Sequence, residues 1–274
     1  KDNIIDQYYG LKIQYLYPFI SGKDFTYIPS PYLVVNAVTE SMLNRVTFRD
    51  NKLRRAIGKE VIESYLYNIV RQLDTVTWIS PELPYKKGKD KLLTSDVIAA
   101  EGDNVIFYDT KAITPSLKLR KFDVAEIEAD IEIYAEDVIQ IYNQINNYLQ
   151  GCFQLDKQYL KDKIFGIVVV LEDAVVSRKK VYEKVYEILE KTETLDTEEK
   201  NYICSHIKVL PLRAIECMIL QNTSLLPELI EQLSKPERWY DYTYTNATIE
   251  NGKIPLYSKY EKDLKSRIKN RIMG

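Results

Sequence analysis

Hydrophobic residues recur at helical spacing in two long segments of the chain. Across residues 51–73 they stand four positions apart, which predicts an amphipathic helix, and residues 136–150 carry a similar pattern. The two apolar faces consist of Ile57, Val61, Tyr65 and Ile69, and of Val138, Ile141, Tyr142, Ile145 and Leu149. Further helices are predicted over residues 181–190, 212–220, 225–233 and 257–272.

Short apolar runs between these helices predict β-strands. The run Val105–Tyr108 is β-prone throughout, which favours a central strand buried on both faces. Residues 101–104 have turn composition and can fold the segment that starts at Asp96 back beside this strand as a hairpin. Residues 164–171 suit a parallel strand covered on both sides. Two more strands are predicted over residues 76–79 and 207–210. Together with the helices, these strands indicate an α/β fold.

Composition narrows the class of protein. The 274 residues are 45% hydrophobic and 28% charged, and no apolar run is long enough to cross a bilayer. We therefore expect a soluble cytoplasmic protein of one or two domains with no membrane partner. Cys152, Cys204 and Cys217 lack the spacing of a zinc site or a disulfide framework. The single histidine, His206, is expected to pack on a strand, which argues against a hydrolase built on a histidine base.

Overall charge does not favour binding of a polyanion. The formal net charge is -2, from 38 basic and 40 acidic residues, so nucleic-acid binding would depend on local basic patches. One candidate patch, in a predicted loop, includes Lys86 and Lys87, and a second, with Lys118 and Arg120, follows Lys111. Each patch is equally consistent with an ordinary solvated loop.

Two carboxylates and an amine stand where the predicted hairpin ends. Side chains alternate between faces along a strand, so Asp109 and Lys111 share one face while the side chain of Thr110 turns to the other. Asp96 would lie on the neighbouring strand. Carboxylate oxygens bind Mg²⁺ or Mn²⁺, which lowers the pKa of a bound water, and a lysine can orient that water. These residue types suit a metal-dependent hydrolase.

The pattern resembles that of the PD-(D/E)xK nuclease superfamily, in which an acid begins one strand and acid-x-Lys ends the next. This chain has Asp96 and then Asp109-Thr110-Lys111, with Ser95 in place of the proline and aspartate in place of the commoner glutamate. The resemblance implies a restriction-endonuclease-like core: a mixed central β-sheet flanked by α-helices.

The motif-bearing match covers about residues 51–171. Residues 1–50 are expected to be a lead-in of helix and loop packed on this core. Residues 172–274 are expected to extend the same α/β domain and to end in a basic helix, so extra helical elements stand at both ends. Members of the RecB-type branch that hold an iron–sulfur cluster use four cysteines, and three cannot supply them, so we predict no cluster.

The resemblance also implies a glutamate on the helix that precedes the strands. Glu60 falls opposite the predicted apolar face, whereas Glu63 lies at its margin and could reach a metal, so we favour Glu63. The run from Gly58 to Tyr65 is similar to the Gly…Glu-x-Tyr pattern of several bacterial members. The alternative is a solvated glutamate.

A second helix carries a further match. Gln144 and Tyr148 fit the Q-x-x-x-Y motif of the RecB-type branch, where the motif lies beside the metal site and helps to place the nucleic acid. Because they are four residues apart, the two side chains lie on adjacent turns of one side of the helix. Such a pair also occurs as ordinary surface decoration.

The resulting hypothesis is hydrolysis of a phosphodiester bond by a metal-bound water, with DNA favoured over RNA, in defence, restriction or repair. Glu63, Asp96, Asp109 and the Thr110 backbone carbonyl would hold Mg²⁺ or Mn²⁺, and Lys111 would align the water. The residues expected to contact nucleic acid are Gln144, Tyr148, Lys86, Lys87, Lys118 and Arg120. Two alternatives stay open: a catalytically inactive nucleic-acid-binding module of the same fold, and an assembly domain that uses residues 1–50 or 257–272 to bind a partner subunit or a second copy.

Overall fold

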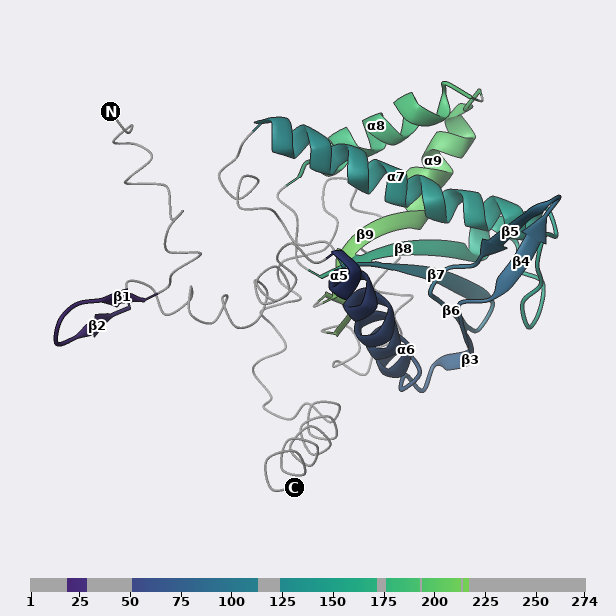
Figure 1. The fold of residues 1–274 in the computed structure, drawn as a ribbon. Coiled ribbons are helices and arrows are strands. Elements are labelled where there is room, and N and C mark those ends of the chain that lie inside the picture. Colours follow the sequence, from purple (N-terminus) through teal and green to yellow (C-terminus); the bar gives the residue numbers. More distant parts are fainter. Residues whose placement is uncertain are drawn as a thin grey trace.

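The computed structural model describes residues 19–28, 51–112, 124–171, 176–192, 194–212 and 214–216. A five-stranded sheet in the order β3-β6-β7-β8-β9 forms the centre of the described part (Figure 1). The predicted helices at 225–233 and 257–272, and the basic residues Lys118 and Arg120, lie outside the described residues.

The central sheet is mixed. Its strands are β3 (Val76–Pro81), β6 (Val97–Glu101), β7 (Asn104–Lys111), β8 (Ile164–Val170) and β9 (Ile207–Pro211). The pairs β3–β6 and β6–β7 are antiparallel, whereas β7–β8 and β8–β9 are parallel. The carboxyl ends of β7, β8 and β9 therefore lie at one edge of the sheet. All five strands were predicted from the apolar runs, and β7 and β8 are buried as expected of central strands.

Helices cover both faces of the sheet. One layer consists of α7 (Val124–Leu149), α8 (Arg178–Leu189) and α9 (Thr197–His206), and the other is the helix formed by α5 (Asn51–Ile57), η1 (Gly58–Glu63) and α6 (Ser64–Val70). Alternate residues of β7 serve the two cores: Phe107 packs in the cluster that contains Ile141 of α7, and Tyr108 packs in the cluster that contains Leu66 of α6. The α/β fold with a mixed sheet flanked by helices is confirmed.

The helix at residues 51–70 buries a different face from the one predicted. Val61 is 57% exposed, and the residues that pack inward are Ile62, Leu66, Ile69 and Val70. The cause is the segment Gly58–Glu63, which is π-helical and therefore has a wider turn than an α-helix. A strict four-residue repeat cannot anticipate this change of register.

Three other elements differ from the sequence prediction. The expected lysine-rich loop is a hairpin of β4 (Pro84–Lys87) and β5 (Asp90–Leu93), which turns at Gly88 with a φ of 62°. Helix α7 begins at Val124, a full three turns before residue 136. His206 ends α9 rather than standing on a strand, and its ring stacks between Phe165 and Tyr202, with centroid distances of 4.9 and 4.4 Å. Burial lowers the pKa of His206.

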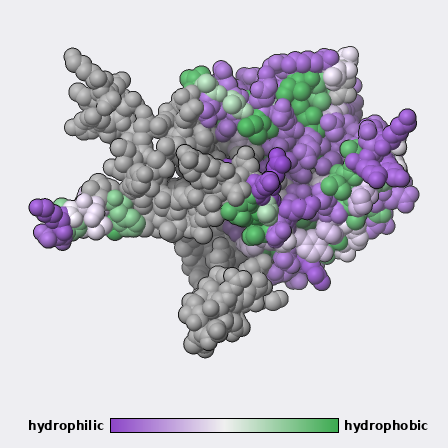
Figure 2. All heavy atoms as spheres, viewed as in Figure 1, coloured by the Kyte–Doolittle hydropathy of each residue, from purple (hydrophilic) through white to green (hydrophobic). Residues whose placement is uncertain are grey.

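The surface of the described part offers two further observations. Figure 2 shows hydrophilic side chains over most of the core face that it presents, with small hydrophobic patches between them. A two-stranded hairpin, β1 (Ile20–Ser21) and β2 (Thr26–Tyr27), lies apart from the central sheet in Figure 1. Among the described helices, none combines the length and the apolar character that a bilayer crossing requires.

Candidate functional site

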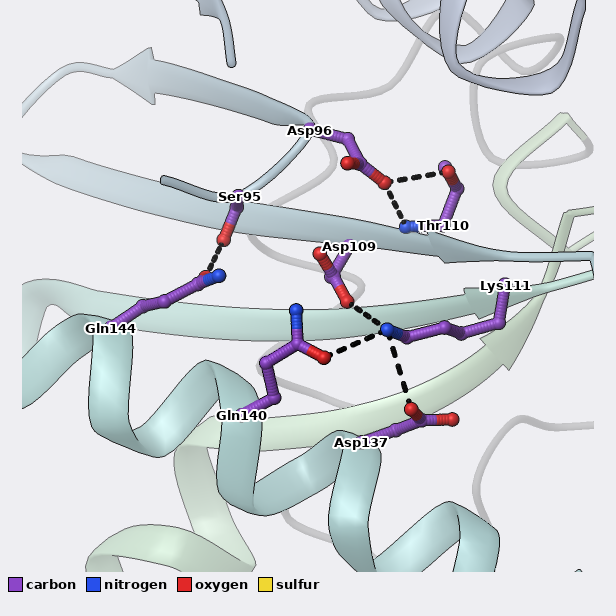
Figure 3. A network of polar contacts seen from close by, with 8 residues as sticks. All are labelled: Ser95, Asp96, Asp109, Thr110, Lys111, Asp137, Gln140 and Gln144. Atoms are coloured by element: carbon purple, nitrogen blue, oxygen red, sulfur yellow. Dashed lines mark hydrogen bonds and ion pairs between the residues drawn. The ribbon is translucent and has the colours of Figure 1, made fainter. Parts of the chain in front are cut away.

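The β6–β7 hairpin brings Asp96 to the end of β7. Asp96 directly precedes β6, and because Val97 pairs with Tyr108, the next position of the register sets Asp96 opposite Asp109. The Oδ2 atom of Asp96 accepts hydrogen bonds from the backbone N–H and from the hydroxyl of Thr110, each at 2.6 Å (Figure 3). Asp96 is therefore held by Thr110, the residue between Asp109 and Lys111.

Asp109 and Lys111 lie on one face of β7, as strand alternation predicted. The Nζ atom of Lys111 is 2.7 Å from Asp109 Oδ2. Two acceptors from α7 also contact this ammonium: Gln140 Oε1 at 2.9 Å and Asp137 Oδ1 at 3.3 Å. Figure 3 shows the lysine side chain pointing into the space between the strand and the helix. The amine thus connects the end of β7 to α7.

Glu63, from the opposite helical layer, lies within electrostatic range of Asp96 and Asp109. The pKa of Glu63 is raised to about 7, mainly by burial and also by the carboxylates of Asp96, Glu82 and Asp109, whereas the ammonium of Lys59 lowers it. Glu60 is exposed. Of the two glutamates considered from the sequence, Glu63 is the one within electrostatic range of both aspartates.

Asp109 is the most buried member of the acid cluster, at 3% exposure. Its pKa is raised to about 6, mainly by burial and also by Asp96 and Asp137, although the charge of Lys111 lowers it. The carboxyl groups of Asp96, Asp109 and Asp137 repel one another in a half-buried space, and a bound cation would stabilise this arrangement. The contact between Lys111 and Asp109 Oδ2 is an ion pair rather than an aligned hydrogen bond, so this buried oxygen lacks a hydrogen-bond partner.

The donor types fit a hard cation, since Mg²⁺ and Mn²⁺ prefer carboxylate and carbonyl oxygens. The described acids, however, are not arranged as a formed metal site. Within the described ranges, no three histidine, cysteine, aspartate or glutamate side chains converge tightly enough to hold a metal ion together. Asp96 is instead bonded to Thr110, and Asp109 is paired with Lys111.

The two residues of the Q-x-x-x-Y match have different surroundings. Gln144 lies beside the site, because its side-chain oxygen accepts a hydrogen bond from the hydroxyl of Ser95, the neighbour of Asp96. Tyr148 is buried with Phe107 and Phe153 in an aromatic cluster. Its hydroxyl accepts from the backbone N–H of Tyr159 at 2.8 Å and donates to the carbonyl of Lys157 at 3.2 Å. These contacts indicate a packing role for Tyr148.

A groove of about 630 Å³ lies between the β4–β5 hairpin and α7. Its lining includes Lys87 and Leu92 from the hairpin and Gln140, Asn143 and Gln144 from α7. The hairpin is fixed to the helix through Asn147, which accepts a hydrogen bond from Lys87 Nζ at 2.7 Å and donates one to the Tyr85 hydroxyl at 2.8 Å. Lys86, the neighbour of Lys87, is exposed on β4. The groove reaches the acid cluster at Gln140, which contacts Lys111.

Sequence reasoning missed Asp137, Gln140 and Asn147. With Gln144 they form a stripe on α7 at successive spacings of three, four and three residues, which places them on one face of the helix. Asp137, Gln144 and Asn147 are buried. The detectable signal was a polar stripe that runs alongside the apolar face, whereas the prediction considered only the apolar residues and the Gln144–Tyr148 pair.

Comparisons with known proteins give distant similarities. No protein-family model matches the chain. A protein of Gelasinospora sp. (strain G114) described as "Probable DNA-directed RNA polymerase" is 26% identical over 134 residues, which are 49% of this chain and 15% of that protein. The chain therefore spans only a small part of that relative. The crystal structure of the small subunit of the heterodimeric restriction endonuclease R.BspD6I is 9% identical, with a TM-score of 0.33, and the similarity covers 69% of this chain and 89% of that one.

Proposed function

We propose that the chain is a Mg²⁺- or Mn²⁺-dependent nuclease of the PD-(D/E)xK superfamily that hydrolyses phosphodiester bonds, with DNA as the favoured substrate. The observation that carries the proposal is the grouping of Glu63, Asp96, Asp109 and Lys111 at the end of β7, from two strands and one helix. They come from three separate segments of the sequence, at residues 63, 96 and 109–111, and their types and order match the motif.

In the proposed site, Glu63, Asp96, Asp109 and the Thr110 backbone carbonyl hold the metal. The bound ion would supply Lewis-acid stabilisation of the phosphate and a more acidic water. To bind the metal through Oδ2, Asp96 would have to turn from Thr110 and Asp109 would have to give up its pairing with Lys111. Lys111 then uses its N–H donors to orient the attacking water. The raised pKa values of Glu63 and Asp109 support this assignment, because a cation would favour both charged carboxylates.

The groove beside α7 is the proposed path of the nucleic-acid strand. The carboxamide oxygens of Gln140 and Gln144 are engaged by Lys111 and Ser95, so their N–H₂ groups remain as donors to phosphate, sugar or base acceptors. Lys87 lines the groove and Lys86 stands outside it, where it can approach the backbone of the strand. We leave Tyr148 out of this surface, and the contacts proposed for Lys118 and Arg120 stay predictions.

A second candidate function is a nucleic-acid-binding module of the same fold without catalysis. The observation in its favour is the pairing of each aspartate with a protein group, together with the lack of three converging metal ligands among the described residues. The polymerase activity in the name of the Gelasinospora protein is not proposed for this chain, because the match spans 15% of that protein. A role in defence, restriction or repair, and a partner subunit or second copy, remain part of the proposal.

The test is cleavage of plasmid and linear DNA by purified protein with Mg²⁺, with Mn²⁺ and with EDTA. We expect metal-dependent cleavage that Asp109→Asn and Lys111→Ala each reduce by at least ~100-fold, a loss typical of groups that act in the transition state. Glu132→Gln, an exposed acid on α7, serves as the matched control. Cleavage that survives both site substitutions would refute the proposal, and DNA binding without any cleavage would favour the second candidate.

A further inference from the structure

The ammonium of Lys111 is held from two sides. Asp109 Oδ2 contacts it from β7 at 2.7 Å, and Gln140 Oε1 and Asp137 Oδ1 contact it from α7 at 2.9 and 3.3 Å. The contact with Gln140 is a hydrogen bond, and the contacts with the two carboxylates are ion pairs. Because Asp137 is buried, its charge is directed at Lys111 and not at solvent.

Asp109 cannot bind a divalent cation and the lysine ammonium equally well through one oxygen. Both are positive, and the proposed function assigns Asp109 to the metal. A cation bound through Oδ2 would therefore displace the ammonium from this oxygen. The two acceptors on α7 remain available to it, since Asp137 and Gln140 are one helical turn apart and lie on the far side of the lysine from β7 (Figure 3).

We infer that Asp137 is a positioning residue that draws Lys111 toward α7 and so frees Asp109 for the cation. This inference rests on the proposed metal site and adds a residue that the nuclease motif does not contain. Without the charge of Asp137, Asp109 is the carboxylate with which Lys111 still pairs, and the lysine competes with the metal. With it, the lysine has a second negative partner and stays beside the site as a charged group. Asp137 itself touches neither metal nor substrate.

The inference predicts opposite effects of two substitutions on binding of Mn²⁺ to the protein without DNA. Lys111→Met removes the competing charge and should tighten Mn²⁺ binding. Asp137→Asn keeps the shape of the side chain but removes its charge, so Lys111 stays on Asp109 and Mn²⁺ binding should weaken by about tenfold, within the usual range for coupled sites. Isothermal titration with Mn²⁺ measures both effects, and circular dichroism checks that each variant is folded.

Simple loss of a negative charge would also weaken cation binding, so the decisive measurement is a double-mutant cycle. If Asp137 acts through Lys111, then Asp137→Asn should change the Mn²⁺ affinity less than about twofold in the Lys111→Met background. Glu132→Gln, which removes an exposed charge from the same helix, should leave the affinity within about twofold of the wild type. Kinetic measurements should give the same answer as the Mn²⁺ titrations: Asp137→Asn should lower kcat at subsaturating Mn²⁺ and leave KM for DNA unchanged.

Two results would overturn the inference. One is an equal loss of Mn²⁺ affinity on Asp137→Asn with and without Lys111, which would mean that Asp137 acts by its charge alone. The other is no loss at all. Failure of the proposed function looks different: folded wild-type protein would then not bind Mn²⁺ in the first titration, before any variant is compared.

Discussion

Replacing Asp109 by asparagine should stabilise the metal-free fold while it abolishes cleavage. Asp109 is buried beside two other acids, and its pKa is raised from the usual 3.8 to about 6, mainly by burial. This difference corresponds to ~3 kcal/mol against the ionised form, at about 1.4 kcal/mol per pH unit. Asparagine imitates the protonated acid and avoids this cost. The ~3 kcal/mol is already net of the attraction of Lys111, and burial of the amide offsets part of it, so we expect a gain of about 1–3 kcal/mol.

The pH dependence has a definite sign. The folded protein retains the Asp109 proton to a higher pH than the unfolded chain does, so the wild type loses stability as pH rises from about 4 to about 6. Burial likewise raises the pKa of Asp137 to about 6, so it adds to the loss in the same window. The advantage of Asp109→Asn should therefore be small near pH 4 and complete above pH ~7.

Thermal unfolding in EDTA at pH 5 and pH 8 measures this effect. A gain of about 1–3 kcal/mol corresponds to a rise in Tm of roughly 2–12 °C at pH 8. Asp103→Asn, on the exposed turn between β6 and β7, is the control and should change stability by less than about 0.5 kcal/mol. A variant Asp109→Asn that melts at or below the wild-type temperature at pH 8 would refute the view that this buried acid destabilises the fold.

Three further predictions follow from the groove, the sheet and the acid cluster. Asn143→Trp should fill the groove and weaken binding of a fluorescein-labelled oligonucleotide by at least ~10-fold in anisotropy titrations. Asn146→Trp, on the same helix but outside the groove lining, should not weaken it, and equal effects of the two substitutions would remove the groove from the proposal. Gly166→Ala should destabilise the fold by about 1–3 kcal/mol in urea unfolding, because its Cβ would overlap a methyl group of Ile141 on α7. The control Gly58→Ala places its Cβ at an ordinary contact distance of 3.5 Å, so similar unfolding midpoints for the two variants would contradict this packing. Binding of Mn²⁺ at pH 6.5 should release roughly one proton, because Glu63 has a pKa of about 7 without metal. Calorimetry in buffers of different ionisation enthalpy measures this proton release, and a binding enthalpy that does not depend on the buffer would argue against Glu63 as a ligand.

The strand-borne half of the site was predictable from sequence because a strand has a fixed period. Alternation alone placed Asp109 and Lys111 on one face of β7, and the turn composition at residues 101–104 placed Asp96 beside them. The antiparallel β6–β7 hairpin and the parallel, buried position of β8 also agree with the sequence prediction.

The helix-borne half was harder because helical register depends on tertiary packing. A π-helical segment moved the buried face of the first helix from Val61 to Ile62, and Glu63 nonetheless faces the acids. On α7, the motif pointed to Tyr148, which packs in the core, and overlooked Asp137, which contacts Lys111 from outside the motif. The Q-x-x-x-Y motif concerns two positions of α7, so it does not indicate that a third residue of this helix, Asp137, contacts Lys111.

The register of the β6–β7 hairpin restricts how this protein can vary in length. Asp96 and Asp109 are thirteen positions apart and stand opposite each other only because the segments between each acid and the tight turn, residues 97–101 and 104–108, are equally long. An insertion of one residue into either strand would send one carboxylate to the other face of the sheet. Relatives that keep the same turn should therefore lengthen or shorten this hairpin by one residue in each strand at once, so the interval between the two acids stays an odd number.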